Sequence, residues 1–364
     1  MSWAPVTGLT AVALLAITCS SPTLPSRTII IPPPAIACPA ELSPVTVSNG
    51  QSATVTYPSP TVTGGTPPVS VSCAPPSGST FTVGSTPVTC TVTDGVRRTA
   101  SCSLVVTVVL PQPRLGVTTI LAFGDSITEG EVQTPIPFRI RPHDVEPDKS
   151  YPADLVTLLA RRYTSQGAAR VDARCTNDPP VPSPAGILVV NAGCGGERAE
   201  DATTLARLND KIATYHPDVV LLLEGVNDLN ARNPDASISA GVQGVQALIG
   251  AAETRGVRVM VGTLLPAVAR FVSLANLIEP FNTRLVPAAA AAGARIVDLY
   301  SDIVTDVTDW ISPYDGLHPT EAGYQEMARF WFNNIHDAFE LPASTARRSV
   351  AVPPSAGVRS GSKR

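Results

Sequence analysis

Apolar and polar residues follow different periods in the two halves of the chain. Between residues 38 and 109, Val alternates with Ser and Thr at a period of two, and turn residues recur about every 8–12 positions, which is typical of a β-sandwich. The apolar strand faces predicted by this alternation also carry cysteines: Val69, Val71 and Cys73; Val88, Cys90 and Val92; Cys102, Leu104, Val106 and Val108. Residues 38–110 are therefore predicted to form an all-β module in which disulfides bridge the sheets.

Residues 114–340 show the other pattern, in which apolar runs alternate with helical periods. Strands are predicted at residues 117–123, 186–190, 219–223, 257–262 and 294–299. Helices are predicted at residues 152–163, 199–215, 236–255, 274–292 and 320–339. This alternation indicates an α/β domain built on a parallel sheet covered by helices.

Composition separates the same two regions. The 364-residue chain is 44% hydrophobic, enough to bury a core, and has a net charge of -4. Only five charged residues precede residue 114: Arg27, Glu41, Asp94, Arg97 and Arg98. The slightly acidic balance and the lack of a Lys/Arg-rich block argue against nucleic acid as a partner.

The first 19 residues resemble an export signal. Residues 8–18 form an apolar run that is too short for a membrane span of about 20 residues but suits a signal-peptide core. Cys19 follows residues 15–18 (LAIT) much as in a bacterial lipoprotein cleavage site. Two alternatives stay open: lipid attachment at Cys19, which would anchor the protein to a bacterial cell envelope, and ordinary secretion. Both predict an extracytoplasmic protein.

The segments that flank the predicted domains have linker-like composition. Residues 20–37 are rich in Ser, Thr and Pro and are predicted to form an extended linker. Residues 341–364 contain basic but no acidic residues and are predicted to form a disordered tail.

The seven cysteines agree with export. Besides Cys19 there is a group of four (Cys38, Cys73, Cys90 and Cys102) and a pair (Cys175 and Cys194). No Cys/His spacing typical of zinc occurs. Six cysteines could all form disulfides, which persist in oxidising compartments; free buried cysteines are the alternative. Among the group of four, the sequence does not choose a connectivity.

Candidate chemistry follows three of the predicted strands, where ligands bind in open α/β sheets. Ser126 would open a helix, either as a helix cap or as a nucleophile. Gly193 would let a backbone N–H approach an oxyanion, or form a turn. Asn227 offers a neutral amide donor, or again a turn.

The fourth candidate is a histidine far downstream. Asp315 precedes His318 by three residues across a Gly-containing turn, so its carboxylate can reach Nδ1 and leave Nε2 free for a serine. The other histidines, His143, His216 and His336, lack comparable surroundings.

These residues carry a resemblance to a known family. Residues 124–128 (GDSIT), 191–193 (NAG), 225–228 (GVND) and 315–319 (DGLHP) match, in chain order, the four blocks of the SGNH hydrolase superfamily, also called GDSL esterases and lipases. The resemblance implies a three-layer α/β/α, flavodoxin-like fold and no metal or organic cofactor. It implies Ser126, Asp315 and His318 as catalytic residues. The Ser126 and Gly193 amides and the Asn227 side chain would form the oxyanion hole, and a Cys175–Cys194 bridge would pin its loop.

The all-β segment resembles the hyalin-repeat (HYR) module, an immunoglobulin-like extracellular domain, over residues 69–102 in particular. This implies no chemistry. A spacer and a surface that contacts glycans remain the two interpretations of residues 38–110.

The sequence as a whole predicts an extracytoplasmic serine esterase acting on a small ester or on an acylated glycan or lipid. An acyltransferase using the same site, and an adhesion protein that binds through the β-sandwich, are the alternatives. Residues 131–150 follow the candidate nucleophile and form either a substrate-selecting loop or a surface insertion.

Overall fold

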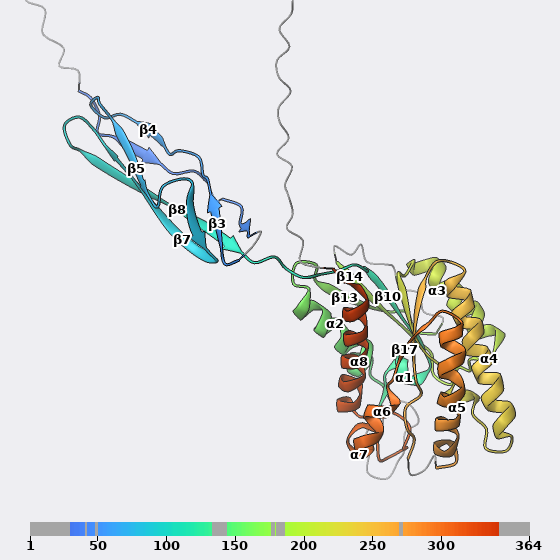
Figure 1. Ribbon diagram of the computed structural model, residues 1–364. Coiled ribbons are helices and arrows are strands. Elements are labelled where there is room, and N and C mark those ends of the chain that lie inside the picture. The colour runs from blue at the N-terminus through green and yellow to red at the C-terminus, as the bar shows by residue number, and fades with distance from the viewer. Residues whose placement is uncertain are drawn as a thin grey trace, which may run out of the picture. The chain divides into compact units, whose positions relative to one another are not determined.

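The computed structural model describes residues 30–40, 42–47, 50–132, 144–175, 179, 186–268 and 272–341. The predicted signal peptide with Cys19, residues 20–29 of the predicted linker, residues 133–143 of the loop after the nucleophile and residues 342–364 of the predicted tail lie outside the described residues. The chain divides into two compact units, residues 1–109 and 110–364 (Figure 1). Within the described ranges, no helix has the length and apolarity that crossing a membrane requires.

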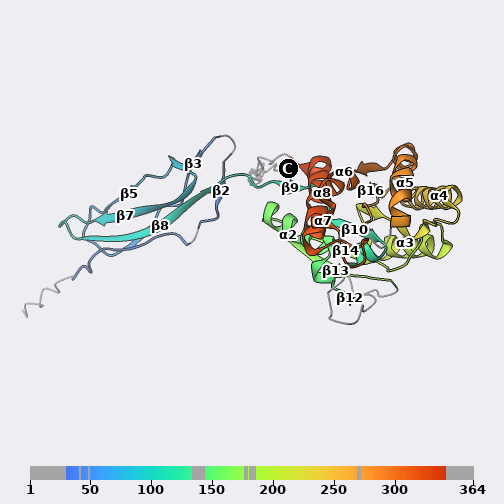
Figure 2. The ribbon, with the colours of Figure 1, turned by 90° about the horizontal axis from the view of Figure 1, so that it is seen from below.

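The first unit is built from short strands. They are β1 (Ala35–Ala37), β2 (Val45–Thr46), β3 (Ser52–Val55), β4 (Thr61–Thr63), β5 (Ser70–Ala74), β6 (Ser79–Thr82), β7 (Gly84–Thr93) and β8 (Thr99–Val109). Strands β2, β8, β7 and β5 form a four-stranded sheet in that order (Figure 2). Outside this sheet, β1 pairs with β4 and β3 pairs with β6. Val55, Phe81, Val88, Leu104 and Val106 are buried between them, so the period-two pattern correctly predicts the all-β class.

Two details of this unit differ from the sequence expectations. Val69 and Val71, expected on a buried face, are exposed: Val71 lies on β5, the edge strand of the four-stranded sheet, and Val69 precedes that strand. Residues 30–37 were expected to belong to an extended linker, but Ala35–Ala37 form β1, and Pro32 O accepts a hydrogen bond from Gly65 N. Backbone pairing thus outweighs the Pro-rich composition there.

Two disulfides tie the first unit together. Cys38 bonds to Cys102, which links the segment after β1 to the four-stranded sheet. Cys73 bonds to Cys90, its direct neighbour across the β5–β7 pair. Only the first bridge therefore joins different sheets, whereas the strand faces alone suggested inter-sheet bridges. In a unit with so small a core, such bridges stabilise chiefly by restricting the unfolded chain.

The second unit contains a parallel sheet of six strands in the order β13-β14-β10-β15-β16-β17. Their bounds are β10 (Thr119–Gly124), β13 (Ala168–Asp172), β14 (Ile187–Gly193), β15 (Val219–Leu223), β16 (Arg258–Gly262) and β17 (Arg295–Val297). Without the edge strand β13, the order is the flavodoxin-like 2-1-3-4-5. The central strands are buried on both faces, which explains their continuous apolar runs.

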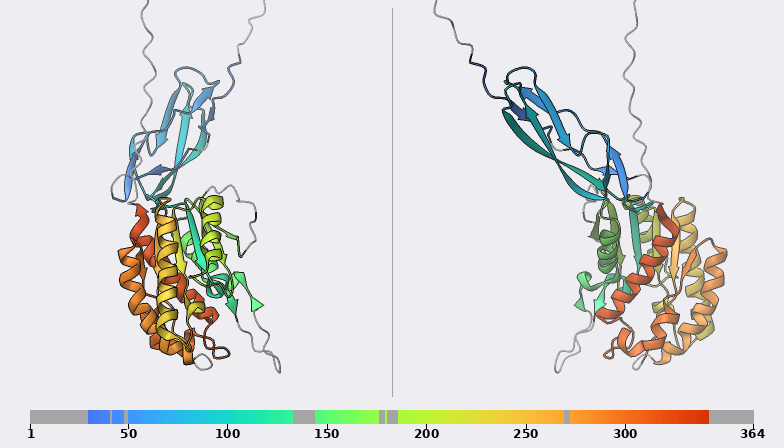
Figure 3. Two further views of the ribbon diagram at one scale, coloured as in Figure 1. Left: turned by 90° about the vertical axis from the view of Figure 1, so that its right-hand side faces the viewer. Right: turned by 60° about the vertical axis from the view of Figure 1, so that its left-hand side comes forward.

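Long helices cover both faces of this sheet. They are α2 (Tyr151–Arg162), α3 (Ala202–Tyr215), α4 (Pro234–Glu253), α5 (Val272–Ala291) and α8 (Glu321–Phe339). Helices α2 and α8 pack side by side on one face, and α3, α4 and α5 cover the other (Figures 1 and 3). The three-layer α/β/α architecture that the sequence predicts is therefore present.

Shorter elements complete the second unit. They are β9 (Arg114–Leu115), which pairs with β18 (Glu340–Leu341), α1 (Ser126–Glu129), β11 (Glu131–Val132), which pairs with β12 (Asp144–Val145), the 3₁₀ turns η1 (Pro147–Lys149), η2 (Val226–Asp228) and η4 (Val304–Asp306), α6 (Tyr300–Ile303) and α7 (Val307–Trp310). Most of them lie in the connections between strands and helices, where the candidate functional residues are found.

The buried central strands should dominate the stability of the second unit. Leu221 lies in β15 and is inaccessible to solvent, so Leu221→Ala should lower the free energy of unfolding by about 2–5 kcal/mol. The matched change Val286→Ala, on a partly exposed position of α5, should alter it by no more than about 0.5 kcal/mol. Denaturant unfolding measures both; equal effects would contradict the assigned core.

Candidate active site

The carboxyl ends of the central strands meet at one edge of the sheet. Gly124 ends β10, Gly193 ends β14, and residues 225–228 follow β15. β14 and β15 pair with opposite sides of β10, so the connections above these strands lead to opposite sides of the sheet. Open α/β sheets bind ligands at such a point. The expected blocks are therefore brought together, and Ser126 follows directly after the central strand.

Asp125, and not Ser126, caps the short helix α1. Its Oδ1 accepts a hydrogen bond from Ile127 N at 2.9 Å. The Ser126 side chain is thus not used as a cap, and its Oγ lies 2.8 Å from His318 Nε2. The side chain of Ser126 is therefore available for the contact with His318, and the capping role belongs to Asp125.

Asp315 and His318 continue the line that starts at Ser126. His318 Nδ1 lies 2.6 Å from Asp315 Oδ2. A carboxylate can only accept, so Nδ1 carries the proton and Nε2 is left to accept from the Ser126 hydroxyl. Asp315 Oδ1 is held by the amides of Leu317 (2.9 Å) and His318 (3.1 Å). All three members of the line are buried.

The backbone on both sides of His318 fixes the imidazole. Ser312 N donates to His318 O at 2.8 Å, next to an isolated bridge between Ile311 and Pro319. Thr320 caps α8, and Pro319 precedes the cap. These backbone contacts with residues 311–312 hold the segment that carries His318.

The backbone N–H of Gly193, which the sequence suggests as an oxyanion donor, is hydrogen-bonded within the protein. It donates to Asn191 Oδ1 at 3.1 Å, and Gly193 is buried. A Cβ at this position would lie 2.0 Å from Glu129 N, so a glycine is needed for the close approach of β14 to α1. Its amide is thus already occupied and does not face the site as a free donor.

The loop after Gly193 is held from several sides. Cys194 forms a disulfide with Cys175, as the sequence suggested. Gly195 N donates to Glu129 Oε2 at 2.9 Å, and Asn227 Nδ2 donates to Glu197 O at 2.9 Å. Further along the loop, the Asp228 carboxylate accepts hydrogen bonds from the amides of Ala199 (2.8 Å) and Glu200 (3.0 Å). The loop is therefore rigidly attached to α1 and to η2.

Gly196 lies in this loop and is exposed. Its φ of +75° falls in the left-handed region, and a Cβ there would meet nothing within 4 Å. Its neighbour Gly195 lies beside Ser126, since a Cβ on Gly195 would be 3.7 Å from Ser126 Cβ. The Gly196 N–H makes no hydrogen bond to the described residues, in contrast to that of Gly193.

Acidic side chains are buried beneath the Ser126–His318 line. Burial raises the pKa of Asp125 to about 7 and that of Asp228 to about 6. Burial, together with the negative charge of Asp125, raises the pKa of Glu224 well above its ordinary value. Neither carboxyl oxygen of Glu224 has a hydrogen-bond partner among the described residues, so its neutral form is favoured.

The pKa values of the two residues behind Ser126 move in opposite directions. Burial by itself would raise the pKa of Asp315, but hydrogen bonds from the His318 ring and from the Leu317 and His318 amides lower it. Burial by itself would lower the pKa of His318, but the bond to Asp315 and the nearby carboxylate of Glu131 raise it. Together, these shifts favour an ionised Asp315 and stabilise the imidazolium.

Glu131 also contacts His318, which the sequence does not predict. Its Oε2 lies 3.4 Å from His318 Nε2, and both side chains are buried. A single Glu five residues after Ser126 does not form a recognisable motif. The contact arises because α8 and the turn before it pack against β11.

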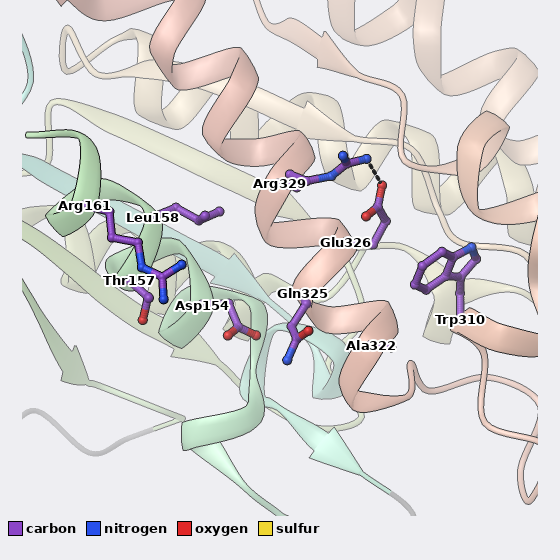
Figure 4. A pocket seen from close by; sticks show the side chains of 9 residues that line it. All are labelled: Asp154, Thr157, Leu158, Arg161, Trp310, Ala322, Gln325, Glu326 and Arg329. Carbon is purple, nitrogen blue, oxygen red and sulfur yellow. Dashed lines mark hydrogen bonds and ion pairs between the residues drawn. The ribbon is translucent and has the colours of Figure 1, made fainter.

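A separate cavity of about 570 Å³ lies on α2 and α8, with Trp310 at its edge (Figure 4). Asp154 and Arg161 reach it from α2, and Glu326 pairs with Arg329 on α8. None of Ser126, Asp315 or His318 lines it. Throughout the part of the chain that is described, no group of three or more His, Cys, Asp or Glu side chains is arranged to hold a metal ion.

Comparison with protein families decides the classification. Residues 122–326 match the model of the GDSL-like Lipase/Acylhydrolase family, and residues 31–108 match that of the HYR domain. The chain belongs to the GDSL-like lipase/acylhydrolase family. This GDSL-family protein is therefore a carboxylic ester hydrolase with an N-terminal HYR domain. A comparison with curated proteins found no match.

Solved structures are similar to the hydrolase in part of its length. A lipase/acylhydrolase from Enterococcus faecalis is 22% identical with a TM-score of 0.46, and the match covers 63% of this chain and 100% of that one. An acetylxylan esterase from Geobacillus stearothermophilus is 19% identical with a TM-score of 0.42, and the match covers 60% and 94% of the two chains.

The buried carboxyl of Glu224 should make the stability of this hydrolase depend on pH. Because its pKa is raised on folding, the folded state keeps a proton that the unfolded chain loses above about pH 4.5. Wild-type stability then falls as the pH rises from this point towards the folded pKa. Glu224→Gln abolishes this loss, so the free energy of unfolding of the variant minus that of the wild type should grow between pH 5 and pH 8. Urea unfolding at the two pH values measures it, and a difference independent of pH would refute the buried neutral carboxyl.

Proposed function

We propose that this protein hydrolyses carboxylic esters outside the cytoplasm by acyl transfer through Ser126, with His318 as the base and Asp315 as the group that orients it. The observation that carries the proposal is the buried line Ser126 Oγ, His318 Nε2, His318 Nδ1 and Asp315 Oδ2, with distances of 2.8 and 2.6 Å. A serine hydroxyl is a weak nucleophile until a neighbouring base takes its proton, and this arrangement supplies such a base.

In the acylation step, Ser126 Oγ would attack the ester carbonyl while its proton moves to His318 Nε2. Asp315 would stay ionised and hold the Nδ1–H tautomer, in agreement with its lowered pKa. Protonated His318 would then give the proton to the departing alcohol. Water would repeat the same sequence on the acyl-enzyme, with His318 as its base, and release the acid.

The negative charge on the carbonyl oxygen needs donors that are in place before the reaction. The Ser126 amide and the second Asn227 amide proton are suited to this, since the first Asn227 proton is used by Glu197 O. For the glycine donor we assign Gly196 in place of Gly193, because the Gly193 N–H is bonded to Asn191 whereas Gly196 is exposed in the loop beside Ser126.

The extracytoplasmic location is supported by the three disulfides, Cys38–Cys102, Cys73–Cys90 and Cys175–Cys194. Disulfides of this kind persist in oxidising compartments and are rare in the cytosol. A HYR domain at residues 31–108 agrees with an extracellular setting. The proposed substrates are small esters, or acyl groups carried by glycans or lipids.

Removal of either reacting group should abolish turnover. Ser126→Ala and His318→Ala should each lower kcat on aryl esters by at least about a thousandfold, because each removes one half of the nucleophile–base pair. His336→Ala is the matched control, since His336 lies partly exposed on α8 and pairs with Asp337; it should keep wild-type kcat. Full activity in either site variant would overturn the proposal. The kcat of the wild type on aryl esters with acyl chains of increasing length would define the substrate range.

Loss of the side-chain oxyanion donor should affect kcat far more than KM. Asn227→Ala should lower kcat by about 100–1,000-fold, since the donor acts on charge that appears only in the transition state. Asn276→Ala, on an exposed position of α5, is the control and should leave both constants unchanged. Steady-state kinetics with a melting curve for each variant would separate this effect from unfolding; a rise confined to KM would argue against the role.

A further inference from the structure

A second carboxylate approaches the base of the proposed mechanism. Glu131 begins β11, only 2% of its surface is exposed, and its Oε2 lies 3.4 Å from His318 Nε2. Asp315 lies at the other ring nitrogen, at 2.6 Å. The imidazole is therefore flanked by carboxylates at both nitrogens, while Ser126 Oγ shares the Nε2 side.

The position of Glu131 is fixed by its backbone. Tyr324, fully buried on α8, donates its hydroxyl proton to Glu131 O at 2.7 Å. Glu131 also pairs with Val145 in the β11–β12 ladder. Tyr324 thus ties the glutamate backbone to α8, the helix that begins three residues after His318.

The charge of Glu131 bears directly on the protonation of His318. When Nε2 is unprotonated, the imidazole is neutral and gains little from the carboxylate beside it; when Nε2 carries a proton, the same contact becomes an ion pair. The other charged groups that act on His318 are Asp315 and Asp125, which are also acidic. A low-dielectric surrounding strengthens these interactions.

We propose that Glu131 is a positioning residue that stabilises the positive charge of His318 each time the imidazole takes a proton from Ser126 or from water. The inference rests on the proposed function. In each step the O–H bond of Ser126 or water breaks, the N–H bond at Nε2 forms, and the proton later passes to the leaving alcohol or to Ser126. Glu131 accepts no proton and lowers the energy of the charged intermediate state.

This role has an opposing effect at low pH. The same ion pair stabilises the resting imidazolium, which cannot act as a base, so the acid limb of the pH–rate profile should lie at a higher pH than it would without Glu131. Glu131 therefore reduces activity at low pH, but it lowers the barrier to proton transfer at pH values where the resting His318 is neutral.

Glu131→Gln tests the charge without changing the shape of the side chain. It should move the midpoint of the acid limb of kcat/KM down by about one pH unit and lower kcat on its plateau by about tenfold. Glu131→Asp keeps the charge and should shift the midpoint by less. Asp235→Asn is the control, because Asp235 is an exposed carboxylate paired with Arg284, and it should leave the profile unchanged.

A folded Glu131→Gln variant whose midpoint stays within about 0.2 pH units of the wild type would overturn the inference. Should Glu131→Gln fail to fold, NMR titrations of His318 in the wild type and in Glu131→Asp, whose shorter side chain draws the carboxylate back from Nε2, decide the matter: a lower His318 pKa in the variant supports the inference, and an unchanged pKa contradicts it. If Ser126→Ala and His318→Ala are inactive but the pH profile of Glu131→Gln is unshifted, the proposed function is supported and only the role of Glu131 is refuted.

Discussion

One hydrogen bond, between the Ser126 hydroxyl and His318 Nε2, joins residues that are 192 positions apart in the chain. Its length can be kept only if the central strand β10, the loop before α8 and the bridge between Ile311 and Pro319 hold fixed places relative to one another. The parallel sheet satisfies this requirement because its fully buried strands cannot shift without opening the core. The remaining features of the site are supports for this bond: the Asp125 cap leaves the serine hydroxyl free, and Asp315 sets the tautomer of the ring.

The same site concentrates acidic groups where water is excluded. Glu131, Asp315, Asp125, Glu224 and Asp228 are all buried, yet they do not all carry charge under the same conditions. Asp315 is favoured as an anion by three hydrogen bonds, whereas Glu224 is favoured as a neutral acid because no partner compensates its burial. The negative charge is thus placed close to the imidazole that would become positive in the proposed mechanism, where it would stabilise that charge.

Much of this fold could be read from the sequence, because its central strands are continuous apolar runs between turns; β15 was predicted at residues 219–223 and has those bounds. The edge strand β13 was not predicted, since only one of its five residues, Val171, is buried and no pattern distinguishes it from a loop.

The four blocks indicated Ser126, Asn227, Asp315 and His318 because each follows a strand or precedes a helix. The Gly193 donor and the Glu131 contact could not be judged in this way, since the direction of one N–H and the approach of one side chain depend on packing. Disulfide pairing in the HYR domain was likewise settled only by which strands are neighbours.

Covalent labelling of the native enzyme tests the central claim most directly. A fluorophosphonate reacts only with a serine whose hydroxyl is activated by a base, so mass spectrometry of the labelled, digested protein should place a single adduct on the peptide that contains Ser126. The adduct should be absent from the His318→Ala variant at the same exposure. Labelling of a different serine, or undiminished labelling without His318, would contradict the account.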